Sequence, residues 1–386
     1  MAQRPSLLRL ALVVILGLTL LTACGSDESE SETTSPSEPS DEQTADGDGA
    51  DSDDTDDRAA TADASDDASD GTDDGNGGTD ETDGETTDDD GDATEPGDAA
   101  FPRTVEDALG PVEVPAQPLR VVALDQLLLD SAFALGLEVI GYTTFADPDG
   151  PIPEIYAEPA ATLATEATWV GDLSSPNLEA IALLQPDLIL TSVVRHENIA
   201  EQLSQIAPTV MSDSAGGGWK DAIRLAAEAT GREAVAEQAI ADYEARAAAV
   251  GEAIRTGYGD PTISVVRFVD VIRLYQPVSF SGVVLADAGL SRPASQQDTE
   301  NFISIISIEE IAEADADVIV YTAFDDPRAT DAAAEVVAGP LWGQLEAAKA
   351  GNVHAVDDER WMTAVGLFGA NAILDDLETI FEVDGS

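Results

Sequence analysis

Three arginine residues lie where this sequence could bind a ligand. Arg195 follows the apolar run 188–194. Arg267 lies late in the run 262–269, and Arg273 lies just beyond it. A guanidinium group binds a carboxylate or phosphate through two parallel hydrogen bonds, and the carboxyl ends of strands are where α/β sheets bind their ligands. The alternative for each arginine is a surface ion pair in a chain that is rich in acidic residues.

Four aromatic residues accompany these arginines. Tyr275 lies two positions after Arg273, and Tyr142 ends an apolar run. Trp219 precedes a long helical pattern, and Trp361 follows another apolar run. Aromatic rings can contact bound groups, but each Trp could equally belong to the core. The predicted ligand-binding residues are therefore Tyr142, Arg195, Trp219, Arg267, Arg273, Tyr275 and Trp361.

The sequence offers little for catalysis or metal binding. It has one Cys and two His, which effectively excludes a disulfide scaffold, structural zinc and multi-histidine metal sites. It has no Gly-x-Ser-x-Gly elbow, Walker loop, Gly-x-Gly-x-x-Gly fingerprint or His-Glu-x-x-His motif. His354 lies inside an apolar run, as a core residue does, whereas His196 lies beside Arg195 and could contact a ligand. We expect a protein that is not an enzyme, with no cofactor and no metal site of its own.

The charge of the chain restricts its partners. Residues 101–386 contain 47 acidic and 14 basic residues, a formal charge of −33. Nucleic-acid affinity rests on clustered Lys and Arg, so we expect no nucleic-acid partner.

A segment of this length can bury a large core, in one domain or in two lobes.

The N-terminus has the pattern of an exported lipoprotein. Arg4 and Arg9 precede or enter an apolar run, Leu7 to Leu21, that is short for a membrane-spanning helix. The run ends in Leu-Thr-Ala-Cys24-Gly-Ser, which resembles the lipobox of bacterial lipoproteins. We therefore predict a signal peptide at 1–23 and lipidation of Cys24, with the mature protein anchored at the outer face of the bacterial cytoplasmic membrane. The alternatives are an ordinary secretory signal or a short anchor with an incidental Cys.

Residues 24–100 have a composition that cannot form a core. Beyond Cys24 they are almost entirely Asp, Glu, Ser, Thr, Gly, Ala and Pro, with no aromatic residue and no aliphatic residue larger than Ala. Such a segment cannot offset the entropy of ordering its chain. It predicts a disordered acidic tether, although a cation-buffering tail is an alternative.

The rest of the chain alternates between strand and helix patterns. Strand patterns at 120–124, 139–142 and 188–192 alternate with helical patterns at 127–137 and 178–184. Residues 219–256 read as one long helix, which Gly231 could interrupt, and strand patterns resume at 262–269, 318–321 and 352–356. This order predicts an α/β fold with mainly parallel sheets. Its parts are an N-terminal lobe at 101–218, an interlobe helix at 219–257 and a C-terminal lobe at 258–386.

An internal repeat indicates that the two lobes are related. Residues 177–192 align with 307–322 over 16 positions without a gap. Each copy has a helix-capping residue, a Glu two positions later, an apolar helix face and a buried strand. A carboxylate in the first turn suits the helix dipole, which alone could explain Glu179 and Glu309.

From about 119 to 381 the chain resembles the periplasmic binding proteins that serve ABC importers of ferric siderophores, haem and cobalamin. The resemblance rests on Arg120 to Asp125 with Ala134-Leu135-Gly136, the two repeat segments, Ser279 to Gly282, Leu285 to Pro293, Leu341 to Leu345, Gly351 to Val353, Trp361 and Asp375 to Leu377. It implies two Rossmann-like lobes joined by a single long rigid helix, with the ligand in the cleft between them. It also implies an iron(III) chelate as ligand, held by the arginine and aromatic residues.

The resemblance assigns further roles. In this family a surface Glu on each lobe pairs with Arg residues of the membrane permease, and Glu179 and Glu309 occupy the matching positions, with Glu310 as a neighbour that could be confused with Glu309. The implied partners are a ferric siderophore and a permease dimer with its ATPase, and we expect a monomer. The same scaffold could instead receive cobalamin or haem. Haem often takes an axial His or Tyr, so His196 and Tyr275 are the residues to test for haem. A sensor lipoprotein without transport could also reuse the fold.

Overall fold

The computed structural model describes residues 100–144, 150–214 and 216–385. The chain divides into two compact units, Met1–Thr86 and Thr87–Ser386, and every described residue belongs to the second unit. The predicted signal peptide 1–23, the lipidated Cys24 and the predicted tether, up to residue 99, lie outside the described residues.

The N-terminal lobe is built on a six-stranded sheet with the order β6-β5-β4-β3-β7-β8. Its neighbouring strands pair in parallel except β5 and β6. Strands β3 and β7 are buried throughout, as central strands of a parallel sheet are when both faces are covered. The strands are β3 (Val121–Ala123), β4 (Val139–Thr144), β5 (Thr168–Asp172), β6 (Ser175–Pro176), β7 (Leu188–Ser192) and β8 (Thr209–Ser212), and a hairpin of β1 (Arg103–Asp107) and β2 (Gly110–Val114) precedes them.

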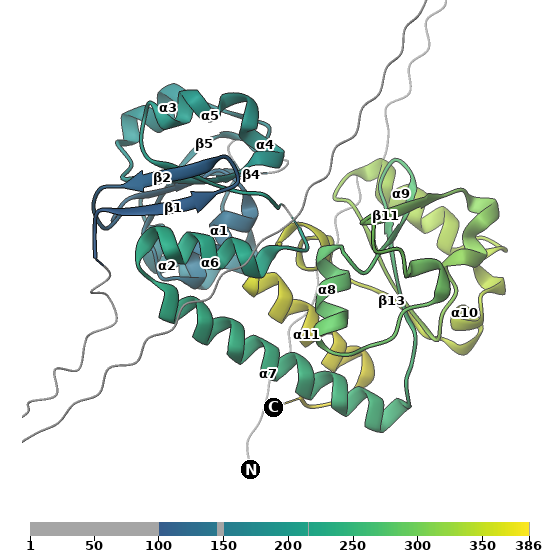
Figure 1. Ribbon diagram of the computed structural model, residues 1–386. Helices are drawn as coiled ribbons and strands as arrows, with labels where there is room; N and C mark the ends of the chain where they lie inside the picture. The colour runs from purple at the N-terminus through teal and green to yellow at the C-terminus, as the bar shows by residue number, and fades with distance from the viewer. Residues whose placement is uncertain (1–99, 145–149, 215, 386) are drawn as a thin grey trace, which may run out of the picture. The chain divides into compact units, whose positions relative to one another are not determined.

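Helices cover both faces of this sheet, with α3 and α5 on one side and α1 and α6 on the other (Figure 1). Two of them begin at side-chain caps. Asp125 accepts a hydrogen bond from the backbone N–H of Leu127, and Asn177 accepts one from that of Ala180, both at 3.0 Å. The helices are α1 (Gln126–Ala134), η1 (Glu154–Tyr156), α2 (Ala157–Leu163), α3 (Leu178–Leu184), α4 (Val193–His196), η2 (Glu197–Ile199), α5 (Ala200–Ser204) and α6 (Trp219–Thr230).

The connection between the lobes consists of two helices. Gly231 has a positive φ of 71° and ends α6, after which α7 (Glu233–Tyr258) begins. Helix α6 packs against α1, β1 and β8 of the N-terminal lobe. The 26 residues of α7 then lead to the C-terminal lobe (Figure 1), a rise of about 39 Å. The long helix predicted at 219–257 is therefore interrupted at Gly231, and α7 alone runs between the lobes.

The C-terminal lobe has a five-stranded sheet with the order β11-β10-β9-β12-β13. Strands β9, β12 and β13 are parallel, whereas β10 pairs antiparallel with both β9 and β11. The strands are β9 (Ile263–Phe268), β10 (Ile272–Tyr275), β11 (Ile303–Ile306), β12 (Val318–Ala323) and β13 (Val353–Ala355). The helices are α8 (Phe280–Asp287), η3 (Ala294–Gln296), η4 (Ile308–Ala314), α9 (Pro327–Val337), η5 (Trp342–Gln344), α10 (Glu346–Ala350), η6 (Glu359–Thr363) and α11 (Leu367–Phe381).

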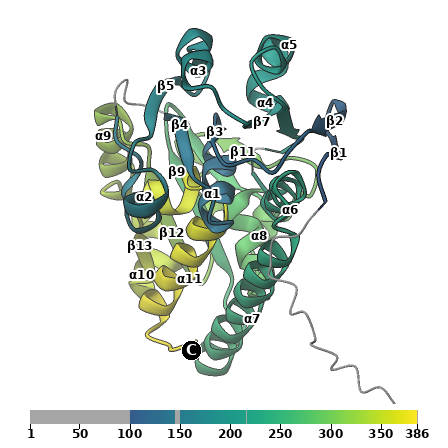
Figure 2. The ribbon, with the colours of Figure 1, turned by 90° about the vertical axis from the view of Figure 1, so that its left-hand side faces the viewer.

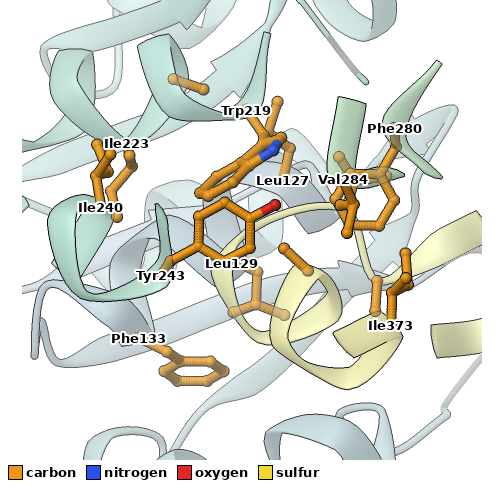
Figure 3. Packing of buried hydrophobic residues seen from close by; sticks show 14 of the residues in the cluster. Leu127, Leu129, Phe133, Trp219, Ile223, Ile240, Tyr243, Phe280, Val284 and Ile373 are labelled. Carbon is orange, nitrogen blue, oxygen red and sulfur yellow. The ribbon is translucent and has the colours of Figure 1, made fainter. Parts of the chain in front are cut away.

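One hydrophobic cluster runs through both lobes. It contains Val121 of β3 and Val265 of β9, and it continues between them through α6, α7 and α11. Figure 3 shows its central part, where Trp219 of α6 and Tyr243 of α7 lie against each other. Helix α11 packs against α7, α8 and α1, and Figure 2 shows α11 and α7 below the sheet of the N-terminal lobe. Because the lobes share a close-packed core, the fold favours small rather than large changes in their relative orientation.

Candidate functional site

A cavity of about 1000 Å³ lies between the two lobes. Its walls come from the carboxyl ends of strands in both sheets: Asp125 follows β3, Arg195 follows β7, Arg267 lies near the end of β9, and Phe324 follows β12. Met362 of η6 adds a wall near the lobe junction. This position agrees with the rule that open α/β sheets bind ligands outside the carboxyl ends of their strands.

The N-terminal wall presents one arginine beside a buried carboxylate. Asp125 is 4% exposed, and besides capping α1 it accepts a hydrogen bond of 2.7 Å from the hydroxyl of Ser192, the last residue of β7. Its Oδ2 also lies 3.6 Å from Nε of Arg195. Arg195 is carried by the short helix α4, which follows β7 directly. The end of one strand therefore supplies both the hydroxyl and the guanidinium that meet Asp125.

The C-terminal wall holds its arginine more tightly. Nε and Nη2 of Arg267 donate to the two oxygens of Asp358 at 2.8 and 2.6 Å, a bidentate pair. Nη1 donates to the hydroxyl of Tyr275 at 3.1 Å, and the guanidinium carbon lies 5.5 Å from the ring centre of Phe324. Burial lowers the pKa of Arg267, but Asp358 and Tyr275 together outweigh it, so the pKa of Arg267 is raised and the group stays charged.

Sheet register explains why Arg273 reaches the same cavity. Arg273 of β10 lies directly opposite Arg267 of β9 in the antiparallel pair, so the two side chains share one face of the sheet. Arg273 also lies 3.4 Å from the exposed Asp270. Of the seven predicted ligand-binding residues, Arg195, Arg267, Arg273 and Tyr275 line the cavity.

The other three predicted residues are core residues, which was the alternative interpretation of the two tryptophans. Trp219 is 1% exposed, and its ring centre lies 5.0 Å from that of Tyr243. Trp361 is fully buried, and its indole N–H donates to Asp376 at 2.8 Å. Tyr142 is 7% exposed, and its hydroxyl donates to the carbonyl of Gly150. The structure thus gives Tyr142, Trp219 and Trp361 packing roles, and none of the three lines the cavity. Their contact with a ligand stays a prediction.

The cavity also contains residues that the sequence analysis missed. Phe280, Phe302, Phe324 and Arg328 line it, and Phe302 is 57% exposed. Phe324 could be found by extending the repeat two positions beyond its last residues. It then aligns with Val194, the residue before Arg195. No comparable local signal marks Phe302.

The sequence pattern of the periplasmic binding protein family matches residues 121–359. The chain belongs to this family. It is 36% identical over 293 residues to the probable siderophore-binding lipoprotein YfiY of Bacillus subtilis, an alignment that covers 72% of this chain and 87% of YfiY. It is 31% identical over 278 residues to the achromobactin-binding periplasmic protein of Dickeya dadantii, which covers 69% of this chain and 88% of that protein. The crystal structure of Staphylococcus aureus SirA complexed with staphyloferrin B is similar, with a TM-score of 0.66, 31% identity, and coverage of 74% of this chain and all of SirA. The predicted family and the two-lobe α/β fold are confirmed.

In this periplasmic binding protein, the two predicted docking glutamates lie in the first turns of related helices. Glu179 is exposed at the start of α3, and Glu309 is exposed at the start of η4. Glu310 has a different role, because its carboxylate accepts from the backbone N–H of Ser307 at 2.9 Å and completes a capping box. Helix capping therefore accounts for Glu310 and leaves Glu309 as the docking candidate of its lobe.

Neither histidine lines the cavity. His196 is 1% exposed; Nε2 lies 2.8 Å from the carbonyl of Leu173, and Nδ1 lies 2.6 Å from the hydroxyl of Thr191. Burial lowers the pKa of His196 and also that of His354, which is half-buried in β13. Within residues 100–144, 150–214 and 216–385, no group of three or more His, Cys, Asp or Glu is placed to hold a metal ion. Within the same ranges, no helix has the length and hydropathy to cross a membrane.

Proposed function

We propose that this protein is a lipid-anchored extracytoplasmic receptor that captures a ferric siderophore and delivers it to the permease of an ABC importer. The observation that carries the proposal is the interlobe cavity, which combines arginines from both lobes with Tyr275 and several phenylalanines. Its volume of about 1000 Å³ is at the upper end for small-molecule sites. It therefore suits a bulky chelate that presents both oxygen atoms and flat rings.

The charge of the cavity supports an anionic or neutral chelate. Its lining has as many arginines as aspartates: Arg195, Arg267, Arg273 and Arg328 with Asp125, Asp213, Asp270 and Asp326. Residues 101–386 as a whole carry a formal charge of −33. The cavity is thus far less acidic than the rest of the chain, which favours entry of anionic oxygen ligands there.

The names of the relatives agree on the kind of ligand. They describe a siderophore-binding lipoprotein, an achromobactin-binding protein and a complex with staphyloferrin B. We infer the same class for this chain, with the iron as cargo and no resident cofactor. The protein binds and releases its ligand unchanged, and the ATPase of the importer supplies the energy. Glu179 and Glu309 contact arginines of the permease dimer, and Cys24 carries the acyl chains that hold the protein at the membrane.

The decisive experiment is a binding titration of the full chain in detergent, followed by tryptophan fluorescence. The panel contains ferric citrate, a ferric tris-hydroxamate, a ferric tris-catecholate, haem and cobalamin, each iron chelate paired with its iron-free form. Saturable quenching by one ferric chelate and not by its iron-free form is the expected result. Binding of haem or cobalamin alone, or of nothing in the panel, would overturn the siderophore assignment.

A further inference from the structure

Ser192 and Thr322 occupy the same position in the two repeats. They are the last aligned residues of 177–192 and 307–322, and the structure places them at the carboxyl ends of β7 and β12. Both are buried, with exposures of 0% and 1%. Each hydroxyl donates a short hydrogen bond to a carboxylate, Ser192 to Asp125 at 2.7 Å and Thr322 to Asp358 at 2.6 Å.

Each of these carboxylates is in turn the partner of a cavity arginine. Asp125 lies beside Arg195, and Asp358 holds Arg267 through two hydrogen bonds. Both lobes therefore present a chain of hydroxyl, carboxylate and guanidinium that ends at the same cavity.

The hydroxyl, carboxylate and guanidinium groups of the two lobes come from different strands, which makes the similarity of the two arrangements informative. In the N-terminal lobe the carboxylate follows β3 and the arginine follows β7. In the C-terminal lobe the arginine lies on β9, directly beside Thr322 in the parallel pair, and the carboxylate follows β13. Only the hydroxyl is at an equivalent position. Simple duplication of one ancestral site thus does not account for the second arginine and carboxylate.

We propose that Ser192 and Thr322 are positioning residues of the ligand site, each of which orients, through one carboxylate, the arginine that its lobe presents to the ligand. The role as a ligand site rests on the proposed function. A carboxylate that accepts from a fixed hydroxyl has one side-chain orientation instead of several, so the guanidinium paired with it is ordered before the ligand arrives. A free arginine would lose side-chain entropy on binding, and ordering it beforehand reduces that cost.

The first test needs no ligand. In the full chain labelled with ¹⁵N-arginine, NMR measures solvent exchange at the Nε–H groups of Arg195 and Arg267. We expect Thr322→Val to accelerate exchange about 3- to 10-fold at Arg267 and not at Arg195, as loss of one hydrogen bond implies. Ser192→Ala should have the reverse pattern, and Thr322→Ser should keep exchange at Arg267 within about twofold of the unaltered chain.

The matched controls are buried hydroxyls elsewhere. Thr209→Val removes a hydroxyl that donates to the carbonyl of Ala207, and Ser131→Ala removes one that donates to Leu127. Both should leave exchange at the two arginines unchanged. Unchanged exchange at Arg267 in Thr322→Val, or equal acceleration in Thr209→Val, would overturn the proposal.

The second test uses the ferric chelate that binds most tightly among ferric citrate, the tris-hydroxamate and the tris-catecholate. Thr322→Val and Ser192→Ala should each weaken its affinity about 3- to 10-fold, while Thr322→Ser, Thr209→Val and Ser131→Ala should not. Equal affinity in Thr322→Val and the unaltered chain would also overturn the proposal. If no chelate binds the unaltered chain, the siderophore assignment fails, and the exchange rates alone still decide whether the hydroxyls position the arginines.

Discussion

The carboxylate of Asp130 accepts a hydrogen bond of 2.6 Å from the backbone N–H of Leu367, and so joins the first helix of the fold to the start of the last. A second bond comes from the N–H of Phe368 at 3.1 Å. Gly366, the residue before α11, offers no capping side chain of its own. Asp130, which lies 237 residues earlier in the sequence, caps the helix instead. The N-terminal lobe is thereby bonded to the segment that contains Met362, a residue of the cavity wall.

This link predicts a pH-dependent stability. Burial raises the pKa of Asp130 to about 8, although the N–H groups of α11 oppose the rise, whereas an unfolded Asp has a pKa of about 3.9. The folded state therefore binds the proton of Asp130 more tightly than the unfolded state does. The resulting contribution to the free energy of unfolding is fully present below about pH 4 and is lost as pH rises through about 8.

The check compares the unaltered chain with Asp130→Asn in urea unfolding at pH 5, 7 and 9. The free energy of unfolding of the unaltered chain should fall with pH relative to that of the variant, which has no proton to lose at this position. The variant should also be less stable at pH 5 by about 1–3 kcal/mol, because an amide cannot accept from both N–H groups as a carboxyl can. Parallel pH curves would show that Asp130 does not titrate in this range.

A second prediction concerns the contact between α7 and α8. A Cβ added at Gly251 would lie 1.6 Å from the carbonyl oxygen of Ala288, whereas one added at Gly257 on the same helix would meet nothing within 4 Å. Gly251→Ala should therefore destabilise the fold by about 1–3 kcal/mol through overpacking. Gly257→Ala should stabilise it by about 0.5 kcal/mol through helix propensity. Urea unfolding measures both, and a stabilised Gly251→Ala would mean that α8 can move away at little cost.

Much of the site could be predicted because it depends on local pattern. Arg195, Arg267 and Tyr275 were found from their place near the ends of apolar runs, since the strands of one sheet end at a common edge. The alternation of elements and the repeat likewise predicted the two lobes. Gly231 was recognised as a possible break, and its positive φ is the reason for it.

The remainder depended on contacts between residues distant in sequence. Trp219 was expected at the cavity from its position alone, but its burial is decided by Tyr243 on the next helix. Asp358 carries no signal of its own among the many acidic residues of the chain, and its pairing with Arg267 spans 91 residues. An aromatic residue or an acid near a strand end looks the same in sequence whether it faces a cavity or a core, so only the packing separates the two.

The proposed docking role of Glu179 and Glu309 predicts a separation of binding from transport. Glu179→Ala and Glu309→Ala should leave chelate affinity unchanged, because both residues are exposed and neither lines the cavity. Association with the permease should weaken about tenfold for each, as expected on loss of an interfacial charge pair. Uptake of radioactive iron by cells that carry the importer measures transport, and titration of the purified chain measures affinity.

Glu310→Ala is the matched control for this experiment. It removes the capping carboxylate next to Glu309 and should lower stability by about 0.5–2 kcal/mol while uptake is retained. Equal loss of uptake in Glu309→Ala and Glu310→Ala would show that the helix start, and not the Glu309 carboxylate, matters to the permease.

The last prediction concerns the shape of the Arg267 group and not its charge. Arg267→Lys keeps a cation beside Asp358, so the buried carboxylate is not left alone, but it removes the fork that binds both carboxylate oxygens and Tyr275. Chelate affinity should fall about 10- to 100-fold, the range for loss of hydrogen bonds to charged groups. Arg224→Lys is the control, since Arg224 of α6 pairs at the surface with Glu237 of α7, away from the cavity. If both variants bind the chelate as the unaltered chain does, the ligand meets Arg267 only as a distant charge, and its recognition falls to Arg195, Arg273 and Arg328.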